Sequence, residues 1–138
     1  MLRVVADPNV LVSAVLTRTG PPAVFLDRWR DGEFDLVVSP ALLAELEDVL
    51  LRPKFLAKIS ENEARAYVDG LSADTLIFSD PDEPNRLASD PDDDYVVALA
   101  VAAGADLIVS GDAHLTGLVD PPIPVLTPRE FMERFRHP

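Results

Sequence analysis

Residues 89–112 read SDPDDDYVVALAVAAGADLIVSGD and contain the strongest fold signal in the chain. An acidic start is followed by the apolar run VVALAVAA, which ends at Gly104. The segment DLIVS comes next, and Gly111 and Asp112 follow it. We interpret this order as an acidic loop, a buried helix that ends at a glycine, and a buried strand with an acid just past its carboxyl end.

Carboxylates at both ends of a buried unit destabilise it unless positive charge compensates them. The chain has 12 Lys and Arg against 24 Asp and Glu, a net charge of −12. This excess argues against a general phosphate-binding surface, but it allows a nucleic-acid substrate if metal ions or a few arginines supply the positive charge. The absence of cysteine excludes thiolate metal sites, and the two histidines are too few for a His-rich zinc site.

The rest of the chain alternates strand-like and helix-like segments. Ser39-Pro40 is typical of a helix start, and Ser60 and Thr127 each begin a capping-box pattern. This alternation predicts an α/β fold, with three layers and a central, mostly parallel sheet of four to five strands covered on both faces. We expect strands at 2–6, 34–39, 75–79, 106–110 and 123–126, with helices at 8–17, 23–31, 41–51, 61–71, about 93–103 and 130–136.

Neither a repeat nor a linker interrupts this pattern, so we expect residues 1–138 to form a single domain. The first ten residues, MLRVVADPNV, resemble a strand rather than a signal peptide. No apolar run reaches the roughly 18 residues of a membrane span. We therefore expect a cytoplasmic protein without a membrane partner.

Several acids fall where strands end. In an open parallel sheet, binding sites form beyond the carboxyl ends of the strands. Asp7 lies at the end of the first expected strand, and Asp112 lies just past the fourth strand. Asp93 or a neighbour begins the helix that precedes the fourth strand. Glu45 lies in the helix that follows the second strand. Oxygen ligands of this kind suit Mg²⁺ or Mn²⁺, and such an ion can activate water in a phosphodiester displacement.

Each acid also has a purely structural interpretation. Asp7 is placed to cap the first helix, and Asp112 after Ser-Gly suits a turn. Periodicity does not choose between Glu45 and Glu47, because both have apolar neighbours along the helix. Residues 90 and 92 fit a loop and a helix cap better than a ligand role.

Three stretches together resemble the motifs of PIN domains, in particular of VapC-like toxins from toxin–antitoxin pairs. They are VVADPNVLVSAVL, SPALLAELEDVLLRPKF and SDPDDDYVVALAVAAGADLIVSGDAHL, in this order and across nearly the whole chain. The resemblance implies a PIN-like fold, a ribonuclease activity that depends on Mg²⁺ or Mn²⁺, a small antitoxin partner, and a homodimer or higher oligomer.

The resemblance also implies roles for individual residues. Pro8 stands where a threonine is common, which is a departure from the usual first motif. The implied catalytic and metal-binding acids are Asp7, Glu45, Asp93 and Asp112, and their implied polar neighbours are Asn9, Ser110 and Asp94.

The preferred hypothesis is an endoribonuclease that hydrolyses RNA phosphodiester bonds with metal-activated water. The alternative is a weak or inactive PIN-like binding module that acts through self-association or an antitoxin. Its apolar segments 23–29 and 49–55 fit an interface and a core equally well. A phosphatase with an aspartate nucleophile is less favoured, because Asn9 stands where such enzymes commonly carry a second aspartate.

Overall fold

One parallel β-sheet organises the part of the chain that the structure describes. The structure is a computed structural model, and it describes residues 1–81 and 91–135, except the side chains of residues 91–94. Within this part, five strands pair in the order β3-β2-β1-β4-β5, and every pairing is parallel. The strands are β1 (Arg3–Ala6), β2 (Asp35–Val38), β3 (Leu76–Ile77), β4 (Leu107–Val109) and β5 (Val125–Leu126).

Strand β1 lies at the centre of the sheet. Val4 pairs with Leu36 of β2 on one side and with Leu107 of β4 on the other. Strands β2 and β3 follow β1 in the sequence and lie on one side of it in the sheet. Strands β4 and β5 come later in the sequence and lie on the other side of β1. The strand order therefore switches between β1 and β4, which is where open α/β sheets form their binding sites.

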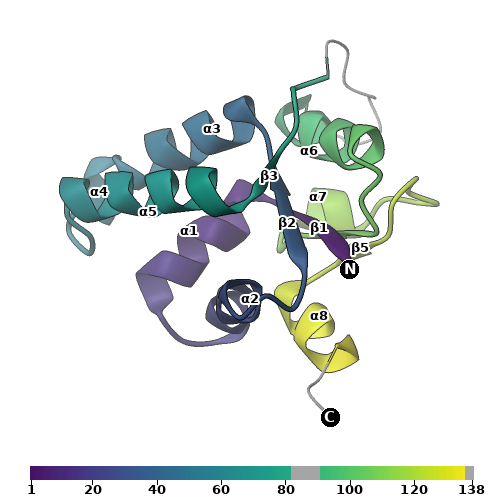
Figure 1. The fold of residues 1–138 in the computed structure, drawn as a ribbon, viewed down its shortest axis with the longest axis horizontal. Helices are drawn as coiled ribbons and strands as arrows, with labels where there is room; N and C mark the ends of the chain where they lie inside the picture. The colour runs from purple at the N-terminus through teal and green to yellow at the C-terminus, as the bar shows by residue number, and fades with distance from the viewer. Residues whose placement is uncertain (82–90, 136–138) are drawn as a thin grey trace.

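Helices cover both faces of the sheet, as Figure 1 shows: α1, α3 and α5 lie to the left of the strands and α6 to the right. Helix α2 packs against α1 and α8, and α6 packs against β1 and β4. This arrangement confirms the predicted three-layer α/β/α class. The helices are α1 (Pro8–Thr17), α2 (Pro21–Arg30), α3 (Pro40–Leu50), α4 (Pro53–Leu56), α5 (Glu61–Asp74), α6 (Pro91–Ala102), α7 (Ala113–Thr116) and α8 (Pro128–Arg134).

The expected helix starts are confirmed where a side chain caps them. The Ser39 hydroxyl accepts a hydrogen bond of 3.2 Å from the backbone N–H of Leu42, with a proline at the first helical position. Ser60 with Glu63 forms a complete capping box, and Thr127 begins another at α8. These side chains satisfy backbone N–H groups that have no partner within the helix, so each start is fixed locally.

Other boundaries differ from the sequence prediction. Helix α2 begins at Pro21, two residues earlier than expected, because proline suits the first helical turn. The edge strands β3 and β5 are two residues long, shorter than the runs 75–79 and 123–126 that predicted them. The single-turn helices α4 and α7 were not predicted, since four residues are too few for a periodic signal.

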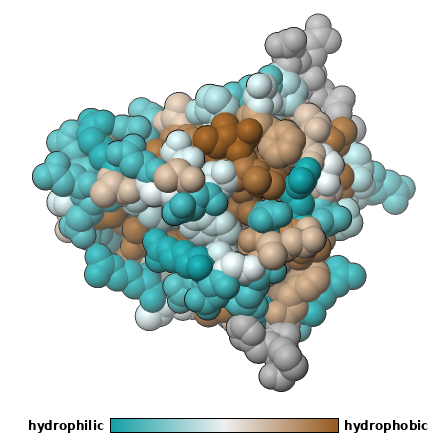
Figure 2. Space-filling model, viewed as in Figure 1, coloured by the Kyte–Doolittle hydropathy of each residue, from teal (hydrophilic) through white to brown (hydrophobic). Residues whose placement is uncertain are grey.

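The core fills both spaces between sheet and helices. Val4, Val5 and Val37 are fully buried in the strands. Most apolar side chains of segments 23–29 and 49–55 belong to this core or pack on it, so these segments serve packing more than an open interface. Figure 2 shows a hydrophobic area over the edge strand β3, where the Ile77 side chain is 50% exposed. In the described part of the chain, no helix is both long and apolar enough to cross a bilayer.

Candidate active site

Asp7 lies at the switch in strand order, directly after β1. Its backbone N–H donates a 2.9 Å hydrogen bond to the carbonyl of Val109, which extends the pairing of β1 with β4 by one residue. Asp7 as a whole is 3% exposed. Its Oδ1 accepts a 3.1 Å hydrogen bond from the backbone N–H of Asn9, so Asp7 does cap α1. The helix cap involves Asp7 Oδ1 alone, and Oδ2 faces the residues that follow β4.

That second oxygen meets the residues after β4. The Ser110 hydroxyl donates a 2.9 Å hydrogen bond to Asp7 Oδ2. Ser110 Oγ in turn accepts a 3.0 Å hydrogen bond from the backbone N–H of Asp112. The fully buried Ser110 therefore joins the two acids that follow β1 and β4. Asp112 also caps α7, because its Oδ1 accepts a 2.9 Å hydrogen bond from the backbone N–H of His114.

The environment of Asp7 opposes its ionisation. Burial raises the pKa of the Asp7 carboxyl above its usual value, and repulsion from Asp112 raises it further. The hydrogen bonds from Asn9 and Ser110 act in the opposite direction and lower this pKa, but they do not cancel the effect of burial. A raised carboxyl pKa is what we expect for clustered acids, although here burial contributes more than repulsion.

The structure separates the two glutamates that periodicity leaves equivalent. Glu45 is half-buried, and its Oε2 accepts a hydrogen bond from the hydroxyl of Tyr95 in α6. Glu47 instead contacts Arg65 of α5, whose guanidinium donates a 2.5 Å hydrogen bond to Glu47 Oε1. Glu45 thus turns toward the helix that begins with the acidic run, whereas Glu47 belongs to an ion pair between α3 and α5.

The third acidic position lies at the limit of the described structure. Asp93 and Asp94 are in the first turn of α6, and their side chains are outside the described residues, as is Asp90 altogether. The backbone places Asp93 four residues before Val97 and seven before Ala100, both fully buried. Residues at these spacings share one face of a helix, which is the ground for predicting that Asp93 belongs with Val97 and Ala100. Its assignment as a ligand remains a prediction.

Two residues that the sequence analysis did not select lie at the same edge. Asp80 follows β3, and its Oδ2 accepts a 3.0 Å hydrogen bond from the backbone N–H of Ala41 at the start of α3. Its Oδ1 is buried and has no hydrogen-bond partner among the described residues. Tyr95 lies close enough to Asp7, Glu45 and Asp80 for all three carboxylates to raise the pKa of its hydroxyl, with burial as the main cause. Asp80 was predictable from its place after a strand, but Tyr95 carried no such signal.

The donor chemistry of this edge fits a hard divalent cation. Asp7, Glu45 and Asp112 offer oxygen atoms, which Mg²⁺ and Mn²⁺ prefer, and a cation would relieve the cost of burying Asp7. Among the side chains that the structure describes, no three acidic or histidine groups lie close enough together to hold a metal ion by themselves. A complete ligand set therefore requires at least one further group, and Asp93 is the predicted one.

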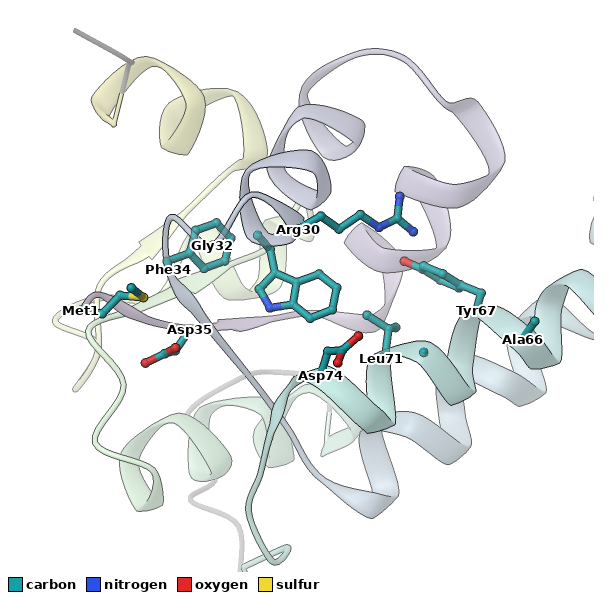
Figure 3. A pocket seen from close by; sticks show the side chains of 11 residues that line it. Met1, Arg30, Gly32, Phe34, Asp35, Ala66, Tyr67, Leu71 and Asp74 are labelled. Carbon is teal, nitrogen blue, oxygen red and sulfur yellow. The ribbon is translucent and has the colours of Figure 1, made fainter.

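One of the surface hollows adjoins these acids. A cavity of about 300 Å³ is lined by Asn9, Ser13, Gly111 and Asp112, among other residues of the α1, α2 and α8 starts. Another, of about 500 Å³, lies between α2 and α5 at the amino end of β2, and Figure 3 shows Arg30 and Tyr67 at one end of it and Met1 and Asp35 at the other. The second cavity is larger, but it lies at the edge of the sheet opposite to the acids.

Comparison with known proteins shows the family of this chain. Residues 3–114 match the family model of the PIN domain, so the chain belongs to this family. Among individual proteins, it is 28% identical over 144 residues to an uncharacterized protein, MJ1680, of Methanocaldococcus jannaschii, an alignment that covers 97% of this chain and 92% of that protein.

Solved structures share the fold at lower identity. PAE2754 from Pyrobaculum aerophilum superposes with a TM-score of 0.66 at 15% identity, over 97% of this chain and 94% of that one. VapBC2 from Rickettsia felis, bound to a DNA fragment from its promoter, superposes with a TM-score of 0.65 at 12% identity, over 91% of this chain and 98% of that one. FitAcB from Neisseria gonorrhoeae superposes with a TM-score of 0.59 at 18% identity, also over 91% of this chain and 98% of that one.

Proposed function

We propose that this chain is a metal-dependent endoribonuclease and the toxin component of a toxin–antitoxin pair, with residues 1–138 acting as one domain. The observation that carries the proposal is the buried Asp7 carboxylate, held by Ser110 next to Asp112 at the switch in strand order. A buried carboxylate with a raised pKa destabilises the protein on which it occurs. Such a group at a binding edge is a candidate for function rather than for stability.

The proposed roles follow from position. Asp7, Glu45, Asp93 and Asp112 would hold Mg²⁺ or Mn²⁺, with Asn9, Ser110 and Asp94 beside them. The bound cation would supply Lewis acidity that activates water and offsets charge on the scissile phosphate. The Ser110 hydroxyl fixes the orientation of the Asp7 carboxylate, and the backbone bond from Asp112 fixes Ser110 in turn.

The substrate must approach an acidic surface. A phosphodiester carries negative charge, and carboxylates a few ångströms away would repel it without a cation between them. The net charge of −12 makes broad affinity for RNA unfavourable, so we expect recognition of a limited class of RNA. The hollow beside Asn9 and Asp112 is the place where a nucleotide next to the scissile bond would fit.

Cleavage of structured RNA with Mn²⁺ tests the proposal, with two variants of the same helix. We expect Glu45→Gln to lower the cleavage rate on the order of 100-fold or more, because it removes a charged ligand. Glu47→Gln is the matched control, since Glu47 pairs with Arg65, and it should cleave at nearly the wild-type rate. Asp93→Asn should behave like Glu45→Gln.

The outcomes discriminate between the two functions. Equal cleavage by wild type and Glu45→Gln would refute the proposed site and point to contamination or to a different site. Absence of cleavage by wild type would favour the alternative, a PIN-like module that acts by binding. We also propose a cytoplasmic location, an antitoxin partner and self-association as a homodimer or higher oligomer. The exposed Ile77 on the edge strand β3 is compatible with a protein contact at that edge. Size-exclusion chromatography with light scattering would measure the oligomeric state.

A further inference from the structure

Tyr95 connects two helices that lie on opposite faces of the sheet. It belongs to the second turn of α6, and its hydroxyl donates a hydrogen bond to Glu45 Oε2 of α3, 50 positions away in the sequence. Helices α3 and α6 lie on either side of the strands in Figure 1, so this contact passes over the carboxyl edge of the sheet. The contact therefore lies at the same edge as Asp7 and Asp112.

The surroundings of the Tyr95 hydroxyl define what it can do. The hydroxyl lies against the Glu45 carboxylate and is hydrogen-bonded to its Oε2. A neutral phenol that faces carboxylates can act as a hydrogen-bond donor, and a carboxylate can only accept. Tyr95 is thus a donor directed at one oxygen of Glu45.

Glu45 needs such a partner more than the other acids do. Asp7 is fixed by hydrogen bonds from Asn9 and Ser110, and both acids at the strand ends have short side chains. Glu45 projects from a helix on a longer side chain, which has more rotamers and loses more entropy when it is fixed. A side chain held in one rotamer before the ligand arrives binds that ligand more tightly.

We propose that Tyr95 is a positioning residue, which holds the Glu45 carboxylate at the carboxyl edge of the sheet in the orientation that the divalent cation requires. This inference rests on the proposed function, because it assumes that the cation binds there. It adds a residue that neither the sequence motifs nor the family membership assigns. Tyr95 acts through Glu45 and contacts neither substrate nor cation.

A structural role alone is the competing explanation, and Tyr67 provides the comparison. The Tyr67 hydroxyl is also in a buried environment, but it donates a 2.9 Å hydrogen bond to the backbone carbonyl of Leu11 and so links α5 to α1. Tyr67→Phe and Tyr95→Phe each delete one hydroxyl from the helical layers. Loss of a hydrogen bond to a backbone carbonyl should lower stability, whereas loss of the bond to Glu45 should lower cation affinity.

The test is Mn²⁺ binding by the purified full chain, freed of metal and measured by electron paramagnetic resonance of unbound Mn²⁺. We expect Tyr95→Phe to bind Mn²⁺ roughly 10-fold more weakly than wild type, with an unchanged far-ultraviolet circular dichroism spectrum. Tyr67→Phe should retain wild-type affinity. Cleavage by Tyr95→Phe should be reduced at low Mn²⁺ and recover when Mn²⁺ is raised about 10-fold, which a general folding defect would not do.

A double variant tests whether Tyr95 acts through Glu45. In a Glu45→Ala background, Tyr95→Phe should cause no further loss of affinity, because its target is gone. Equal affinity of wild type and Tyr95→Phe, or a full additional loss in the double variant, would overturn the inference while leaving the metal site intact. Absence of Mn²⁺ binding by wild type would instead overturn the proposed function, and the inference with it.

Discussion

The Ser110 hydroxyl donates a 2.9 Å hydrogen bond to Asp7 Oδ2, joining two residues that are 103 positions apart in the chain. Both are buried, and each directly follows a strand of the central pair β1 and β4. The bond fixes a carboxylate whose ionisation burial opposes. The protein thus maintains a destabilising acid in a defined orientation.

Neutralising Asp7 should stabilise the metal-free protein. Because the pKa of Asp7 is raised in the folded state, the folded protein binds more protons than the unfolded one between the two pKa values. Its stability therefore falls as pH rises from the unfolded pKa, near 3.9, through the folded pKa, and stays lowered above it. Asp7→Asn lacks this penalty, so its melting temperature at pH 7 should exceed that of wild type by roughly a few degrees.

The pH dependence isolates the charge in this comparison. At pH 4 the Asp7 carboxyl of the folded protein is more fully protonated, so the advantage of Asp7→Asn should shrink. The hydrogen bonds of the substituted amide do not vary with pH, so the change in its advantage between the two pH values reports the ionisation of Asp7, including the stronger bond from Ser110 to the ionised form. Thermal unfolding in the presence of chelator gives the difference in melting temperature between Asp7→Asn and wild type at pH 4 and at pH 7. A larger difference at pH 4 would contradict the assigned direction of the pKa shift.

Divalent metal should stabilise the folded protein. A ligand at 100 times its dissociation constant adds about 2.7 kcal/mol, which corresponds to a rise in melting temperature of roughly 5–10 °C for a domain of this size. Asp7→Asn and Asp93→Asn should weaken this rise, and Glu47→Gln should not. Scanning fluorimetry across Mg²⁺ and Mn²⁺ concentrations gives the measurement, and an unchanged wild-type melting temperature at saturating metal would argue against the site.

Removing the Ser110 hydroxyl should lower stability. Ser110→Ala deletes the donor to Asp7 Oδ2 and the acceptor for the backbone N–H of Asp112, both in a buried region. We expect a loss of about 1–3 kcal/mol in the free energy of unfolding, measured with urea. Ser72→Ala, a half-buried hydroxyl on α5, serves as the control and should change stability by less than about 0.5 kcal/mol. Equal effects would show that the buried bonds contribute little.

Arg28 should hold the C-terminal helix in place. Its buried guanidinium donates hydrogen bonds to the backbone carbonyls of Met132 and Phe135 at the end of α8. Arg28→Met keeps the apolar stem and removes these donors, so we expect a loss of about 2–3 kcal/mol. Arg30→Met, on the exposed side of the same helix, is the control. Limited proteolysis should cut Arg28→Met near α8 first, and an unaltered digestion pattern would contradict this role.

Much of the fold could be predicted because its signals are local. The apolar runs identified the strands and the capping residues fixed several helix starts, since a cap involves neighbours within three residues. Asp7 and Asp112 were selected by the rule that sites form where parallel strands end, and the structure places both at the switch in strand order. The helices α4 and α7 were missed because single turns have no periodicity.

What the sequence by itself determined is the α/β class, the order of its elements and the acids at the strand ends, because these depend on near neighbours and on a repeating apolar pattern. Only the tertiary structure decided that Glu45 faces Tyr95 while Glu47 faces Arg65, and that Asp80 reaches the start of α3. Periodicity shows which residues share a face of one helix, but the rotation of that helix against its neighbours is set by packing between distant segments.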